Sequence, residues 1–63
     1  MLKAETVEQF YILQWLEANF EIEHLEIKLV DRYNVKIKDL DNKIARVTYV
    51  SRDNITLTDD ITY

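Results

Sequence analysis

From about residue 25 onwards, apolar side chains occupy alternate positions, and every one of these positions has an odd number. The alternation covers four short segments, at 25–29, 33–37, 45–49 and 55–57, with charged or polar residues at the even positions between. A period of two is typical of strands that bury one face of a sheet. The sequence therefore predicts three or four strands whose odd-numbered side chains face the core.

This shared parity constrains the turns between the strands. Residues opposite each other in an antiparallel pair lie on the same face, so an odd number must face an odd number. Each loop then holds an odd number of residues, or one strand carries a bulge. Ile37 opposite Ala45 leaves the three-residue loop 40–42, in which Asn42 suits the left-handed position.

The same rule applies to the other two connections. Tyr49 opposite Ile55 places a loop at 51–53. Near 31–32 a two-residue turn would set apolar side chains against charged ones, so we expect a three-residue loop or a bulge there.

The first third of the chain predicts a helix. Thr6 to Gln9 fits a capping box, in which the Thr6 side chain accepts from the Gln9 N–H and the Gln9 side chain reaches back. The helix should run from about Val7 to Ala18, with Asn19 as a left-handed residue at its end. A competing interpretation extends helix from Glu21 through Leu29, with Ile22, Leu25 and Leu29 as its apolar residues.

Together these elements predict an α+β fold over residues 1–63, a single small domain with one N-terminal helix packed on a three- or four-stranded antiparallel meander sheet. The helix and the odd-numbered strand positions should supply the core. Its expected members are Val7, Tyr11, Ile27, Leu29, Val35, Ile37, Val47 and Tyr49.

The predicted helix carries more apolar side chains than one sheet can cover. At roughly 100° per residue these side chains form no single stripe. The surplus that we assign to an interface comprises Phe10, Leu13, Trp15 and Leu16. Because an exposed apolar patch usually marks an interaction site, we predict a homodimer that uses this helix, or another protein bound to the same surface.

Composition narrows the class of protein. A chain of 63 residues with 48% hydrophobic residues can fold as one domain but gains from oligomerisation. It has no cysteine and no glycine, which excludes disulfides, thiolate metal sites and glycine-rich phosphate loops. The beginning of the chain lacks the basic and apolar stretches of a signal peptide, and the longest apolar run, 10–13, is too short to span a membrane. We expect a cytoplasmic protein without membrane contact.

Candidate catalytic and metal-binding residues are few. His24 follows Glu21 and Glu23, but this spacing matches no zinc signature and predicts a solvated histidine at the start of a strand. Asp59–Asp60, with Asp53 nearby, lack the ligand alternation and the glycine of a calcium loop and predict a polar, frayed end. One histidine and one serine form no nucleophile–base set. We predict no enzyme, no cofactor and no metal.

The charges are distributed unevenly, although the net charge is an ordinary −4. Glutamates dominate the first 23 residues, whereas even strand positions carry a basic face made of Lys28, Lys36, Lys38 and Arg46. Nucleic acid is an unlikely ligand for this face, because Tyr33 and Tyr49 should point to the core and leave it without a stacking aromatic.

These observations predict a small non-enzymatic protein-interaction or regulatory module that acts through an apolar helix surface. The first alternative is an acidic inhibitor that mimics nucleic acid and occupies a nucleic-acid-binding protein. Such an inhibitor would be compatible with a phage or mobile-element accessory protein. The second alternative is nucleic-acid binding through the basic sheet face.

Overall fold

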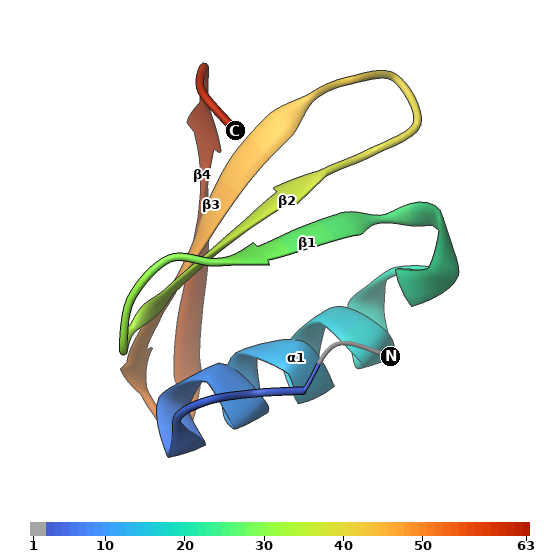
Figure 1. Cartoon of the computed structure of the whole chain (residues 1–63). Helices are drawn as coiled ribbons and strands as arrows, with labels where there is room; N and C mark the ends of the chain where they lie inside the picture. The colour runs from blue at the N-terminus through green and yellow to red at the C-terminus, as the bar shows by residue number, and fades with distance from the viewer. Residues whose placement is uncertain (1–2) are drawn as a thin grey trace.

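A computed structural model describes residues 3–63, and it consists of one N-terminal helix packed on an antiparallel sheet (Figure 1). The elements are α1 (Val7–Asn19), the short 3-10 helix η1 (Ile22–His24), β1 (Glu26–Leu29), β2 (Asn34–Lys38), β3 (Ile44–Ser51) and β4 (Asn54–Asp60). The sheet has the order β1-β2-β3-β4, so each strand pairs with its neighbour in sequence. The predicted α+β meander is confirmed, with four strands.

The predicted capping box begins α1. The Thr6 hydroxyl accepts a hydrogen bond from the Gln9 N–H at 3.1 Å, and the Gln9 side-chain oxygen accepts one from the Thr6 N–H at 3.2 Å. The helix ends one residue later than predicted, and the expected left-handed conformation of Asn19 was wrong. Asn19 is still helical, and its side chain donates to the Trp15 carbonyl at 2.8 Å. The chain then leaves the helix at Phe20 in an extended conformation, with φ −138°.

The Gln9 side chain also ties α1 to the turn between β1 and β2. Gln9 is only 3% exposed, and its amide nitrogen donates to the Asp31 carbonyl at 2.6 Å. Its amide oxygen accepts from the Glu5 N–H at 2.9 Å, and the Thr6 hydroxyl donates to the Arg32 carbonyl at 2.9 Å. The first turn of the helix is therefore anchored at one end of the sheet.

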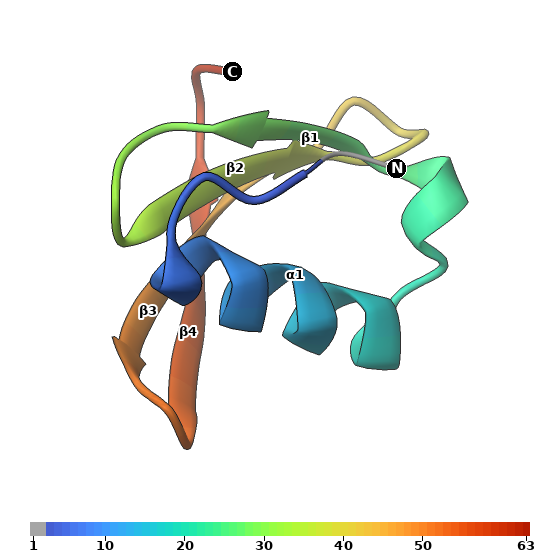
Figure 2. The ribbon, with the colours of Figure 1, turned by 60° about the horizontal axis from the view of Figure 1, so that its bottom comes forward.

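The core lies between α1 and the two central strands. Figure 2 shows the helix lying across one face of the sheet. Its buried members are Ile12, Leu13, Leu16, Val35, Ile37 and Val47. The sheet side of the predicted core is confirmed, since Ile27, Leu29 and Tyr49 are half-buried against this cluster.

The helix side of the predicted core was wrong. Val7 is 66% exposed, and Tyr11, although half-buried, is not among the side chains packed against the core cluster. The inward positions are instead Gln9, Ile12 and the two leucines of the core, which follow the spacing i, i+3, i+4, i+7 of a single helix face. A polar residue at the first of these positions hides the stripe in the sequence.

The connection between β2 and β3 is as predicted. Ile37 lies opposite Ala45, and the Asp39 N–H donates to the Lys43 carbonyl at 3.0 Å, which closes the three-residue loop 40–42. Asn42 has φ 63° and occupies the left-handed position, where an Asn is tolerated better than most residues.

The connection between β1 and β2 is also a three-residue loop, at 31–33. The Val30 N–H donates to the Asn34 carbonyl at 3.2 Å across it. Tyr33 therefore belongs to the loop and is exposed, contrary to the prediction that it faces the core. The segment before β1 forms η1 and then strand, so the competing helix over 21–29 is not present.

Between β3 and β4 a bulge replaces the predicted three-residue loop. Tyr49 lies opposite Ile55 as expected, but Ser51 already pairs with Asn54, and the register shifts between Tyr49 and Ser51. Val50 is the extra residue, so a two-residue turn and a bulge together satisfy the parity rule.

Replacing Gln9 by leucine should destabilise the protein even though it makes the core more apolar. The change leaves the Asp31 carbonyl and the N–H groups of Glu5 and Thr6 without their present partner, and an unsatisfied buried group costs about 1–3 kcal/mol. Urea unfolding of Gln9→Leu should show this loss, whereas Gln14→Leu, on the exposed side of the same helix, should change little. A Gln9→Leu protein as stable as the wild type would contradict the anchoring role.

Candidate functional site

The structure separates the four helix residues that the sequence assigned to an interface. Leu13 and Leu16 are 5% and 0% exposed, so both belong to the protein's own core and that part of the interface prediction was wrong. Trp15 is half-buried against the core and meets Phe20 edge-to-face, with ring centres 6.0 Å apart. Phe10 alone of the four remains strongly exposed, at 50%.

Phe10 begins a row of aromatic rings that crosses from the helix to the sheet. Its ring meets that of Tyr11 edge-to-face at 5.8 Å, and Tyr11 stacks on Tyr49 of β3 at 6.0 Å. The Arg52 guanidinium, from the β3–β4 turn, lies 5.4 Å from the Tyr11 ring centre. We call these four residues the aromatic row. Aromatic rings and arginine are the residue types enriched at the centres of protein interfaces.

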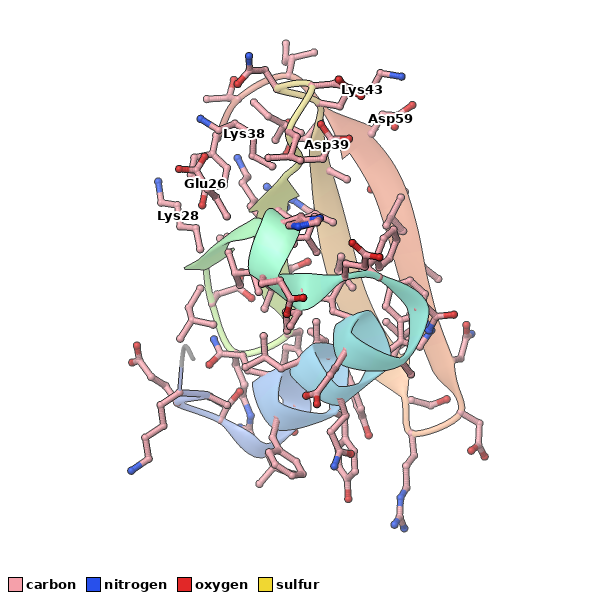
Figure 3. All side chains as sticks on the ribbon, turned by 90° about the vertical axis from the view of Figure 1, so that its right-hand side faces the viewer. Glu26, Lys28, Lys38, Asp39, Lys43 and Asp59 are labelled. Atoms are coloured by element: carbon pink, nitrogen blue, oxygen red, sulfur yellow. The ribbon has the colours of Figure 1, made fainter. Side chains whose placement is uncertain are left out.

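A second surface is the open face of the sheet, opposite α1. The strand register sets Lys28 opposite Lys36, and Lys36 opposite Arg46, so these cations are neighbours. Figure 3 shows Lys28, Lys38 and Glu26 projecting from the same side of the sheet. Glu26 forms an ion pair with Lys38 at 3.0 Å.

Asp60 supplies a second carboxylate to this basic face. Its oxygen lies 3.4 Å from the Lys36 ammonium and 3.6 Å from the Arg46 guanidinium. Hydrogen bonds from the N–H groups of Ile61 and Thr62, with Lys36 adding to them, hold the pKa of the Asp60 carboxyl below its usual value. The predicted frayed end at Asp59–Asp60 was therefore wrong, because β4 continues through Asp60.

The segment after β4 folds over the same face. The Lys36 ammonium donates to the Thr62 carbonyl at 2.6 Å, and the Lys28 ammonium donates to the main-chain oxygen of Tyr63 at 3.1 Å. The Tyr63 ring lies 5.2 Å from the Lys38 ammonium and 5.8 Å from that of Lys28. Burial, with Glu26 nearby, raises the pKa of its phenol.

Sequence reasoning missed this aromatic ring on the basic face. Tyr63 follows the last strand, so neither periodicity nor parity assigns it to a face of the sheet. Each of the four cations of the face has an acceptor inside the protein, either a carboxylate or a main-chain oxygen.

The remaining candidate from the sequence is His24 with its neighbouring glutamates. His24 lies in η1, not at a strand start, and its ring nitrogen is 2.9 Å from the Glu21 carboxylate on an exposed part of the surface. Within residues 3–63 no three histidine, cysteine or acidic side chains are grouped to hold a metal ion.

The same stretch, residues 3–63, contains no helix that is long and apolar enough to cross a membrane. Compared with protein-family models, with curated proteins and with solved structures, the chain matches none of them. The function must therefore be inferred from the two surfaces described above.

Proposed function

We propose that this chain is a small non-enzymatic protein-interaction module that binds a partner protein through the outer surface of α1. The observation that carries this proposal is the aromatic row, whose first member, Phe10, is half exposed. Val7, one turn earlier on the helix, is more exposed still. Fully burying an exposed phenylalanine is worth about 1.5–3 kcal/mol, and half of the Phe10 side chain is still available for a partner to cover.

The geometry of the row favours binding because its rings are already held in place. Tyr11 lies between Phe10 and Tyr49, and Arg52 approaches the Tyr11 ring. A side chain that is ordered before binding loses little rotamer freedom when the partner arrives, so more of the contact energy appears as affinity. A rigid aromatic cluster beside an arginine is the usual composition of an interface hot spot.

Nucleic-acid binding by the basic face ranks second. Tyr63 provides the stacking ring that the strands themselves lack, which favours this alternative. Against it, Glu26 and Asp60 neutralise part of the charge, and the segment 61–63 occupies donors that phosphates would need.

The acidic-mimic alternative ranks third. A mimic of a phosphate backbone needs an uninterrupted row of free carboxylates. Glu8, on the acidic helix, is instead paired with Arg32 at 3.2 Å. Its own main-chain N–H and then Arg32 hold the pKa of the Glu8 carboxyl below its usual value.

Replacing Phe10 by serine should weaken partner capture without unfolding the protein, since half of this ring is already in water. Affinity purification from the native cell followed by quantitative mass spectrometry should identify a protein that the wild type retains. We expect its affinity for Phe10→Ser to fall about tenfold or more. Leu40→Ser is the matched control, because Leu40 is 75% exposed and lies in the β2–β3 loop, outside the aromatic row. Equal retention by both variants would refute the proposed surface.

Titration with DNA and RNA at low salt tests the second-ranked function. We expect no binding by the wild type, because the cations of the basic face have internal acceptors. Binding that weakens steeply with salt, and that drops in Lys28→Ala but not in Lys43→Ala, would reverse the ranking. Lys43 is the control because it lies in the β2–β3 connection and outside the basic face.

A further inference from the structure

The outer edge of β4 has a hydrogen-bonding pattern that the strand register defines. The Tyr49 N–H donates to the Tyr33 carbonyl at 2.8 Å, so the main-chain groups of Tyr49 point from β3 towards β2. Successive residues of a strand point to opposite sides, which directs the main-chain groups at 44, 46 and 48 towards β4. Their opposite residues in β4 are 56, 58 and 60.

The intervening residues of β4 must then direct their N–H and C=O groups away from β3. These residues are Ile55, Leu57 and Asp59. Among residues 3–63 no other strand pairs with this side of β4, which is an edge of the sheet. The edge thus presents three residues with main-chain donors and acceptors ready for another strand.

This edge has less than the usual protection, since its only charged residues, Asp59 and Asp60, lie at its end. Natural edge strands are commonly short, or carry lysine or proline, which discourages pairing with other chains. The other edge, β1, has only four residues and carries Lys28, whereas β4 has seven residues without lysine, arginine or proline. Three of its residues are β-branched, and Leu57, at its midpoint, is 40% exposed.

We propose that two copies of this chain pair antiparallel through their β4 edges, with a twofold axis at Leu57, and form one continuous sheet. Leu57 then faces the partner's Leu57, and Ile55 faces the partner's Asp59, so all the outward-pointing residues enter the ladder. Thr56 faces the partner's Thr58, which is a favourable β-branched pair on the open face.

Neighbouring registers pair fewer residues. A shift of two residues towards the β3–β4 turn leaves only residues 54–58 of each copy paired, because Asp53 belongs to the turn. A shift of two residues the other way leaves only residues 56–60 paired and sets Thr56 against the partner's Asp60. The midpoint register alone pairs all seven residues of β4, which is why a second copy fits this edge.

The leucine pair lies on the same face of the sheet as α1. The helix packs on β2 and β3, so it leaves the odd-numbered side of β4 partly open (Figure 1). The dimer would cover Leu57 there and leave Phe10 free. The dimer proposal can therefore be tested separately from the proposed partner-binding surface on α1.

A cysteine placed at the twofold axis tests the dimer directly. The chain has no cysteine, so Leu57→Cys introduces a single thiol, and any disulfide must join two copies. Directly opposite residues of a hydrogen-bonded antiparallel pair have Cα atoms about 5.5 Å apart, within the range for a disulfide. Mild oxidation at micromolar concentration should give a covalent dimer at least tenfold faster than for Leu40→Cys, whose thiol is exposed in a loop. Equal rates would overturn the proposal.

Sedimentation of the unmodified protein provides the second test. The wild type should shift from monomer to dimer as concentration rises, and more readily at higher salt, because each copy carries a net charge of −4. Leu57→Lys should remain monomeric, while Leu40→Lys should dimerise like the wild type. A wild type that stays monomeric at every concentration would overturn the proposal. A dimer that Phe10→Ser disrupts and Leu57→Lys leaves intact would do the same and assign self-association to the helix.

Discussion

The buried amide of Gln9 determines how the helix lies on the sheet. It satisfies two N–H groups ahead of the helix and the carbonyl of Asp31 in the β1–β2 turn, so the first turn of α1 is fixed in both position and rotation. With Gln9 turned inward, the residues three, four and seven positions later must also face the sheet. The identity of the core residues and of the exposed residues on the helix both follow from this one side chain.

That rotation explains which functional residues the helix offers. Leu13 and Leu16 are drawn into the core, and Phe10, next to Gln9, is turned outwards. In the observed rotation Tyr11 lies at the border of the buried face, where its ring stacks on that of Tyr49. The binding surface that we propose thus follows from the buried side chain of Gln9. The number of apolar residues in the helix does not explain it.

The sheet could be predicted from the sequence in detail because its signal is redundant. The alternation predicts where the strands lie, and the odd numbers predict which side chains face the core. Together they predict that Ile37 pairs with Ala45 and that Asn42 is left-handed, as the structure has it. The parity rule requires either a loop with an odd number of residues or a bulge, and the β3–β4 connection satisfies it with the bulge at Val50. Sequence parity alone does not choose between a longer loop and a bulge.

The helix and the basic face were less predictable for different reasons. Apolar residues surround most of α1, so the true stripe is recognisable only if a glutamine is accepted as an inward residue. The even numbers of the basic residues predicted that they share one face. They did not predict the carboxylates and main-chain oxygens that bind these residues. Asp60 lies at an even position at the end of β4, beyond the apolar alternation at 55–57 that marked this strand in the sequence. Tyr63 reaches the face through the path of the chain after β4, which no periodic pattern describes.

The strand order of the meander has a kinetic consequence. Every strand pairs with the one before or after it, and the connections are two to five residues long, so each pairing closes a short loop at a small entropic cost. The chain also contains no proline, so slow peptide-bond isomerisation does not delay folding. Rapid closure shortens the time for which β4 is exposed in a partly folded chain. The local order of pairing therefore limits how long β4 stays without a partner strand before the sheet is complete.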